Sequence, residues 1–378
     1  WRAGIMGLAV LGLNYLLVDL GSQARGYALV LAPALGCWWL ARETWLRPTT
    51  PAEADAGHPW GYAALAILGT LAHPLMLLQV LLPLGLWQVS LLARQRAGWP
   101  AALAQLVRWQ LPAGLFSAWF YWSHLRVMAI GNQTDRATWE ALAVLQGLGS
   151  QFLGWPASKI LGLAVFLLLL AWLAWEAWRA PTGDEVFWLL VLLVPSVYIA
   201  ITQPVVLATR YFALPLQFLL WVLARTLWLG WQAGGRRRLL AGTVLTLYLV
   251  GQVAGLSLFV QWGRGDMPAL LAAIAAESPN TGEPITIGGD HDFRDGLPVR
   301  WYTQRWQARG MTYVDQGHWP EQGPDWYLVH QTYDWPVTMA YIVPINGGPD
   351  KATFTYYQVA SRSAPYSGYS WYLYRRLE

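Results

Sequence analysis

The sequence predicts an α-helical polytopic membrane protein with a C-terminal extracytoplasmic α/β domain. Three observations predict this class. The chain is 56% apolar and only 12% charged, which is outside the usual range of soluble domains. Nine apolar segments precede residue 260, and the charge balance then reverses, from 16 basic and 9 acidic residues before that point to 9 and 12 after it. We therefore expect a membrane domain over residues 1–260 and a soluble domain over residues 261–378.

The nine apolar segments are candidate membrane helices. They cover residues 3–18, 27–41, 60–72, 75–93, 109–122, 157–178, 186–202, 211–229 and 239–260. Several are shorter than the roughly 20 residues of an upright spanning helix. We expect these to extend into flanking polar residues or to lie partly in the membrane interface.

The basic residues of the loops predict the orientation. If the first segment runs outward, ten arginines fall in inner loops: Arg42, Arg47, Arg94, Arg96, Arg108, Arg179, Arg225, Arg236, Arg237 and Arg238. Five basic residues fall in outer loops: Arg25, Arg126, Arg136, Lys159 and Arg210. Because inner loops carry the excess of Lys and Arg, everything after Val260 is expected outside the membrane.

The C-terminal part alternates helical and strand-like patterns, as a small α/β domain does. Helices are expected at residues 267–278 and 299–310. Strands are expected at residues 284–289, 311–316, 325–331, 352–360 and 369–377. Residues 333–351 are loop-rich, and "GGDHDFRDG" (288–296) is expected to be a solvated loop, because it lacks the ligand spacing and terminal glutamate of a calcium loop.

Several kinds of site are excluded by what the sequence lacks. The single cysteine, Cys37, lies in an apolar run, so neither a disulfide framework nor a cysteine metal site is available. The membrane half has no pair of histidines at metal-ligand spacing, which makes a zinc site improbable. No phosphate-binding glycine loop, nucleophile elbow or basic nucleic-acid patch is present. The sequence requires no cofactor and leaves a divalent metal open.

Two arginines at the outer rim are the first candidates for function. Arg25 lies in "VDLGSQARGYALVL" with Asp19, Gln23 and Tyr27 around it, and Arg210 lies in "ATRYFALPLQ". Ionisable groups at the edge of apolar spans are costly and tend to face a cavity or a partner. Two guanidinium forks there suit one phosphate. The alternative is that both arginines snorkel to the headgroups, with Asp19 neutralising Arg25.

His73, in "GTLAHPLMLLQV", lies at an outer turn between two apolar runs. It is either a hydrogen-bonded turn residue or a ligand contact, and the first reading is the more common one. The crowded aromatic stretches "FSAWFYW" and "WLAWEAW" are typical of interface belts and helix packing.

Four stretches, taken in order, carry a family resemblance. "GSQARGYALVLAPALGCWWLARE" (21–43) resembles a segment of GT-C class glycosyltransferases, and "ATRYFALPLQFLLWVLA" (208–224) is similar to their late membrane segment. The "AHP" turn (72–74) and "RWQLPAGLFSAWFYW" (108–122) match an outer turn and a helix start of that family. The nearest pattern is that of the bacterial dolichyl-phosphate-mannose-protein mannosyltransferase and aminoarabinose transferase group. Gln23 stands where the family usually has glutamate.

The resemblance implies transfer of a sugar from a polyprenyl-phosphate donor to a hydroxyl of a protein, lipid or glycan acceptor. The reaction would invert the anomeric centre at the outer face of a bacterial inner (plasma) membrane. Arg25 and Arg210 would hold the lipid phosphate, and the side chains lining the same mouth would be those of Gln23, Tyr27, His73 and Tyr211. The family's acidic motif is not found, and because Trp1 starts inside an apolar run, the catalytic base is expected upstream. Asp19 is the remaining, weaker candidate.

Two other classes of function compete with the transferase. A transporter or flippase for a lipid-linked or anionic solute would also place arginines in a cavity, although its sequence should show two related halves, which we do not find. A membrane scaffold whose outer domain binds a partner is the third reading. Nucleic acid is not an expected partner.

Overall fold

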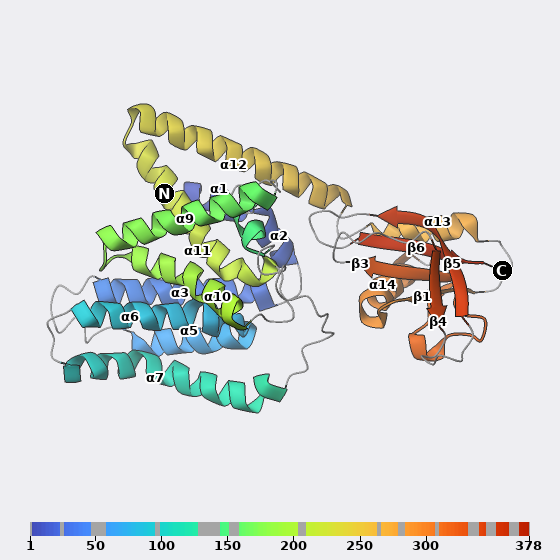
Figure 1. Cartoon of the computed structure of the whole chain (residues 1–378), viewed down its shortest axis with the longest axis horizontal. Coiled ribbons are helices and arrows are strands. Elements are labelled where there is room, and N and C mark those ends of the chain that lie inside the picture. The colour runs from blue at the N-terminus through green and yellow to red at the C-terminus, as the bar shows by residue number, and fades with distance from the viewer. Residues whose placement is uncertain are drawn as a thin grey trace. The chain divides into compact units, whose positions relative to one another are not determined.

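The computed structural model describes residues 2–22, 26–46, 58–94, 99–127, 144–150, 159–202, 209–262, 266–278, 284–306, 310–331, 340–344, 353–362 and 370–377. The chain forms two compact units, Trp1–Ala254 and Gly255–Glu378. The first is helical and the second contains a sheet (Figure 1). The division falls within α12 (Gly235–Trp262), the helix in which the predicted boundary at 260 and 261 also lies. The chain is therefore a helical membrane protein with a small C-terminal α/β unit.

The first unit is built from helices. Their bounds are α1 (Arg2–Gly12), α2 (Tyr15–Ser22), α3 (Gly26–Leu46), α5 (Pro59–Ala72), η1 (Leu77–Leu81), α6 (Leu82–Arg94), α7 (Trp99–Ser123), η2 (Leu125–Val127), α9 (Lys159–Arg179), α10 (Asp184–Thr202), η3 (Thr209–Phe212), α11 (Ala213–Gln232) and α12. Among the described residues, five helical stretches are long and apolar enough to cross a membrane, or six if the bent pair α1–α2 is one span. The predicted count of nine spans is not confirmed.

The first predicted segment, residues 3–18, is broken in the structure. The helices α1 and α2 meet at an angle of 71°. Asn14 causes the break, because its side-chain oxygen accepts a hydrogen bond from Leu17 N at 3.1 Å and so starts a new helix. Asn14 is fully buried, and its amide nitrogen also donates to the hydroxyl of Tyr248 at 3.3 Å. A single polar residue within an apolar run therefore divides the segment.

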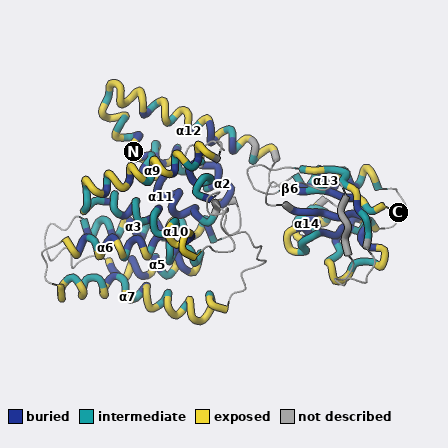
Figure 2. The backbone as a smooth tube through the Cα atoms, viewed as in Figure 1, coloured by how far each residue is buried: buried dark blue, intermediate teal, exposed yellow. Residues whose placement is uncertain are grey.

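The helices differ sharply in how much of their surface is covered. In the apolar stretch of α11, 61% of the residues are buried, compared with only 24% in that of α12. Figure 2 shows the same contrast, with long exposed stripes on α12, α9 and α7. Exposed apolar side chains such as Leu168 and Leu247 on these stripes are the pattern expected where hydrocarbon is the solvent. The most buried helix, α11, is thus the centre of the bundle.

Buried aromatic rings pack the bundle around α3. Trp45 contacts Trp87 and Trp109 in edge-to-face geometry, with ring centroids 5.4 and 5.5 Å apart. Tyr62 completes the group at 5.3 Å from Trp109. Such pairs contribute about 0.5–1.5 kcal/mol each beyond the area that they bury.

Two buried glutamines and one ion pair join helices that are distant in sequence. Gln79 Nε2 donates to the carbonyl of Tyr211 at 2.6 Å, and Gln217 Nε2 donates to the carbonyl of Leu31 at 3.1 Å. Arg42 Nε lies 2.7 Å from Asp184 Oδ2 and joins the end of α3 to the start of α10. In an apolar surrounding each such contact is strongly favoured, because an unpaired polar group there is costly.

The second unit contains a six-stranded sheet. Its elements are α13 (Met267–Glu277), β1 (Ile285–Gly289), η4 (Asp292–Gly296), α14 (Leu297–Trp306), β2 (Met311–Tyr313), η5 (Gln316–His318), β3 (Trp326–Gln331), β4 (Ala340–Pro344), β5 (Thr353–Arg362) and β6 (Ser370–Arg376). The strand order is β2-β1-β3-β6-β5-β4. β1 runs parallel to β2 and β3, and the remaining pairs are antiparallel. Leu270, Ile274, Ile287, Val299 and Leu328 form its core.

One prediction for this unit was incomplete and another was wrong. Residues 333–351 are not only loop, since they contain β4, which pairs with β5 through Tyr341 and Tyr356. Because glycines and prolines surround it, the short β-branched run that forms this strand could not be recognised as a strand from the sequence. The stretch 288–296 is not a solvated loop, because it begins in β1 and closes in η4 with Asp295 fully buried.

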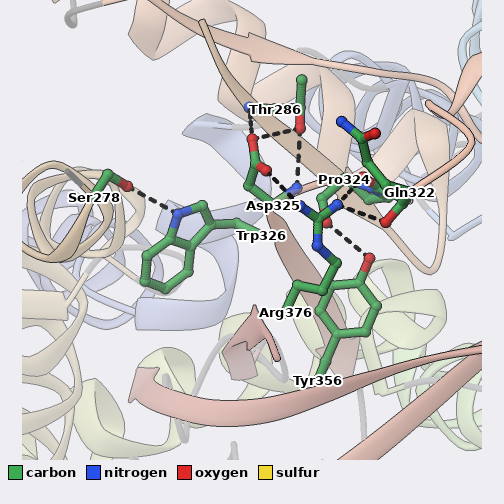
Figure 3. Close-up of polar contacts among 9 residues, drawn as sticks. Ser278, Thr286, Gln322, Pro324, Asp325, Trp326, Tyr356 and Arg376 are labelled. Carbon is green, nitrogen blue, oxygen red and sulfur yellow. Dashed lines mark hydrogen bonds and ion pairs between the residues drawn. The ribbon is translucent and has the colours of Figure 1, made fainter. Parts of the chain in front are cut away.

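A polar network joins β1, the residue before β3 and the end of β6, at one end of these neighbouring strands (Figure 3). Asp325 Oδ2 accepts hydrogen bonds from Thr286 N at 2.9 Å and from Thr286 Oγ1 at 2.8 Å. Arg376 Nη2 lies 3.2 Å from Asp325 Oδ1. Nearby, Trp326 Nε1 donates to Ser278 Oγ at 3.0 Å. The network connects residues far apart in sequence, so we interpret it as structural.

Candidate functional site

Three residues predicted to line one mouth meet in the first unit. Tyr27 lies in the first turn of α3, His73 follows α5 directly, and Tyr211 lies in η3. The ring centroids of Tyr27 and His73 are 4.4 Å apart, and those of Tyr27 and Tyr211 are 6.5 Å apart. The stretches 21–43 and 208–224, which carry the family resemblance, therefore meet at the His73 turn. We call Tyr27, His73, Tyr211 and Gln79 the rim cluster.

Gly26 explains how α3 comes so close to the turn. A Cβ atom at this position would lie only 1.7 Å from the carbonyl oxygen of Ala72. Only glycine therefore allows the first turn of α3 to contact the last turn of α5. This contact places the ring of Tyr27, the next residue, against that of His73.

The backbone around His73 fixes its imidazole. Its own N–H donates to the carbonyl of Gly69 at 2.9 Å, and its Nδ1 accepts a hydrogen bond from Leu75 N at 3.2 Å. A neutral ring that accepts at Nδ1 carries its proton on Nε2, so the tautomer follows from this bond. His73 is thus a hydrogen-bonded turn residue, as the sequence predicts, whose Nε2–H is the remaining donor.

Gln79 belongs to the rim cluster although the sequence did not single it out. It is only 2% exposed, and its amide holds the backbone of Tyr211. Its Oε1 is buried without a hydrogen-bond partner in the described part of the chain. The available signal was one amide in the apolar run "LMLLQVLL". Gln79 lies in the π-helical turn η1, and such turns are frequent at functional sites.

The structure describes only part of the two rim arginines. Arg25 and Gln23 lie outside the described residues, and of Arg210 only the backbone, in η3, is described. In the sequence, Arg25 directly precedes Gly26 and Arg210 directly precedes Tyr211. The structure therefore does not test whether the two arginine side chains converge, and their role as a phosphate clamp stays a prediction.

Asp19 and Tyr27 are more buried than residues that line an open mouth. Asp19 is 8% exposed and lies in α2, which packs against α3 and α11. Tyr27 is 5% exposed. The buried Tyr27 therefore supports the ring of His73 from the protein interior. His73 and Tyr211 are half-buried and form the more open part of the cluster.

No group of three His, Cys, Asp or Glu side chains is placed to hold a metal ion in the described ranges of the chain. The rim cluster offers aromatic faces, an imidazole N–H and an amide. This set suits hydrogen bonding to an anion or a hydroxyl.

A second buried polar group lies at the carboxyl ends of β1 and β3. Asp295 accepts a hydrogen bond from His291 N at 2.9 Å, and Asp290 accepts one from His330 N at 3.1 Å. The charge of Asp290 acts on the carboxyl group of Asp295, so the two side chains form one electrostatic pair. Burial, followed by the charge of Asp290, raises the pKa of Asp295 to about 9, and burial also raises the pKa of Asp290. At neutral pH the pair therefore holds a proton.

Comparison with known proteins gives no match. No family model, no curated protein and no solved structure matches this chain. Its function is therefore inferred from the rim cluster and from the residues beside it.

Proposed function

We propose that the protein is a GT-C class glycosyltransferase, which transfers a sugar from a polyprenyl-phosphate donor to a hydroxyl acceptor at the outer membrane face. The observation that carries the proposal is the meeting of Tyr27, His73 and Tyr211. Two arginine-bearing stretches far apart in sequence thereby reach one point. This meeting supports a shared role for Arg25 and Arg210 over independent snorkelling.

The reaction needs two kinds of group. A carboxylate accepts the proton of the acceptor hydroxyl, whose oxygen forms the new bond to the anomeric carbon with inversion. The bond from that carbon to the phosphate oxygen breaks at the same time, and the polyprenyl phosphate leaves with the electron pair. Cationic donors at the phosphate stabilise the charge that it gains, so no second carboxylate is needed as general acid.

The rim residues divide these tasks. Arg25 and Arg210 supply the guanidinium forks for the phosphate, and the Nε2–H of His73 donates to a phosphate or acceptor oxygen. Tyr27 holds the imidazole in place, and Gln79 holds the backbone next to Arg210. Gln23 and Tyr211 line the mouth, and Asp19 orients Arg25 or serves as a second carboxylate.

The proposed topology keeps nine membrane segments. Five described spans and the bent α1–α2 pair are apolar enough by themselves. The helices α3, α5 and α7 bring the total to nine. With the positive-inside orientation, the C-terminal unit lies outside a bacterial inner membrane, where it helps to select the acceptor.

A binding experiment tests the phosphate clamp. The chain is placed in detergent micelles, and its affinity for undecaprenyl phosphate is measured for the wild type and for Arg25→Lys and Arg210→Lys. Lysine keeps the charge but loses the bidentate fork, so we expect a loss of about tenfold to a hundredfold, or about 1–3 kcal/mol. Arg126→Lys is the control, since Arg126 is exposed and lies over the Trp122 ring at 4.2 Å.

Equal losses in all three variants would mean that general charge, and not a clamp, binds the lipid.

A second assay separates the transferase from the transporter. It follows a labelled sugar on the polyprenyl-phosphate donor in vesicles that contain the protein. Covalent attachment of the label to a hydroxyl acceptor supports the transferase, whereas movement of intact donor across the membrane supports the transporter.

A further inference from the structure

The turn between α11 and α12 brings the adjoining ends of two membrane helices together. Gly234 and Gly235 have φ values of +70° and +51°, a conformation that other residue types rarely adopt. A Cβ atom on Gly230 would lie 3.1 Å from the Cβ of Ala241 on the facing helix. The helices therefore touch beside the turn. Figure 1 shows α12 returning from the end of α11.

An open groove of about 580 Å³ lies next to this contact. Trp231 forms one side, and one face of α12 forms the floor, with residues that recur every three or four positions: Arg238, Leu239, Gly242, Thr246 and Leu247. With a rise of 1.5 Å per residue, the stretch from Arg238 to Leu247 is about 14 Å long. The groove thus has the length of an acyl-chain segment.

Positive charge gathers at one end of the groove. The guanidinium of Arg238 lies 4.4 Å from the centroid of the Trp231 ring. Arg236 and Arg237 precede it in the first turn of α12. None of these three arginines forms an ion pair with a carboxylate of the described residues. The charge is therefore available to an anion from outside the protein.

The surroundings limit what can occupy the groove. Both α11 and α12 are apolar enough to span the membrane, so the open side of the groove faces lipid. Leu239 and Leu247 are 73% and 67% exposed, and in a bilayer such side chains contact hydrocarbon. An arginine stacked on tryptophan, at the start of a spanning helix, lies at headgroup depth. A ligand with a phosphate and a hydrocarbon chain matches both ends.

We propose that this groove is a binding site for one acidic phospholipid. Its phosphate is held by Arg238 over Trp231, and one acyl chain lies along the face formed by Leu239, Gly242 and Leu247. The missing side chain of Gly242 makes room for the chain. The site shares no residue with the rim cluster, so it holds whether or not the chain transfers a sugar.

The test uses the full chain in detergent micelles with one lipid at a time, either dioleoylphosphatidylglycerol or dioleoylphosphatidylcholine. Native mass spectrometry counts the lipids retained. Arg238→Gln removes the charge, and Gly242→Leu fills the groove; the latter is tolerable because a Cβ there would lie 3.6 Å from the nearest Trp231 atom. Arg237→Gln and Gly12→Leu are the controls, since Gly12 has no atom within 4 Å of a built Cβ.

We expect one phosphatidylglycerol per chain and about tenfold weaker retention in Arg238→Gln and in Gly242→Leu. The controls should bind as the wild type does. The proposal is overturned if phosphatidylcholine binds equally well, if Arg237→Gln loses as much as Arg238→Gln, or if undecaprenyl phosphate displaces phosphatidylglycerol at equal concentration. If a variant unfolds, the unfolding temperature of the wild-type chain tests the proposal instead. Phosphatidylglycerol should raise this temperature, and phosphatidylcholine should not.

Discussion

The ring of Tyr27 lies 4.4 Å from that of His73, with a tilt of 30° between their planes. One residue lies in the first turn of α3 and the other follows the end of α5, so the contact joins the ends of two helices. The imidazole is also held by Leu75 N. A ring fixed from two sides needs little reordering when a ligand arrives, which favours binding.

Gly26→Ala tests the close approach that this contact requires. The added methyl group would lie 1.7 Å from the carbonyl oxygen of Ala72, so the helices must separate. We expect a loss of about 1–3 kcal/mol in unfolding free energy. Gly85→Ala is the control, because no atom lies within 4 Å of its built Cβ, and it should stabilise α6 by up to about 1 kcal/mol. Thermal unfolding in detergent measures both, and equal stability of the two variants would contradict the packing argument.

His73→Phe tests the hydrogen bonds of the His73 ring separately from its packing. Phenylalanine keeps the packing against Tyr27 but has neither an acceptor for Leu75 N nor an Nε2–H donor. We expect a folded protein that binds undecaprenyl phosphate about tenfold more weakly, as loss of one charge-assisted hydrogen bond predicts. His124→Phe is the matched control, because His124 also stacks on an aromatic ring, that of Phe120, with ring centroids 5.3 Å apart. Unchanged binding by His73→Phe would remove His73 from the site.

Asp295→Asn tests the buried carboxyl pair of the second unit. The folded pKa of Asp295, about 9, lies above the value of about 3.9 for an unfolded chain. Its contribution to stability is therefore complete below about pH 4 and is lost as the pH rises through about 9, by at most about 1.4 kcal/mol per pH unit. Asparagine cannot ionise, so the variant should keep its stability between pH 6 and about pH 9.

Hydrogen exchange of peptides from β1 and β3, corrected for intrinsic rates, measures this slope. Asp315→Asn is the control, because Asp315 is 44% exposed and pairs with Arg300 at 2.5 Å on the surface. A surface pair contributes about 0–1 kcal/mol, so this variant should retain the wild-type slope. The same slope in Asp295→Asn would show that other groups cause the pH dependence.

Cysteine labelling tests the orientation. Ser361→Cys lies at an exposed position of β5 and Gln232→Cys at the exposed end of α11, while the native Cys37 is buried. With the C-terminal unit outside, a membrane-impermeant maleimide should label Ser361→Cys in intact spheroplasts. Gln232→Cys should react only after permeabilisation. The reverse result would invert the topology and move the rim cluster to the inner face.

Apolar run length predicted the helical membrane unit, and alternating helical and strand-like patterns predicted the α/β unit, because both signals depend on many residues. Positions set by one side chain could not be predicted this way. Asn14 breaks the first segment by capping α2, and Asp295 is buried because the fold supplies the N–H of His291. The convergence of Tyr27, His73 and Tyr211 was expected only through the resemblance. Gln79 was missed since its partner is a backbone carbonyl distant in sequence.

The two buried glutamine contacts also bear on biogenesis. Gln79 donates to a carbonyl in η3, and Leu31 on α3 accepts its hydrogen bond from Gln217 on α11. Helices enter the membrane in the order of synthesis, so α3 and η1 are inserted before their partners leave the ribosome. Until α11 arrives, Gln79 and the carbonyl of Leu31 must find temporary partners, such as the insertion machinery, other helices or water. A nascent chain that ends before η3 therefore lacks the partners of Gln79 and of the Leu31 carbonyl, and it exposes polar groups that the finished bundle hides.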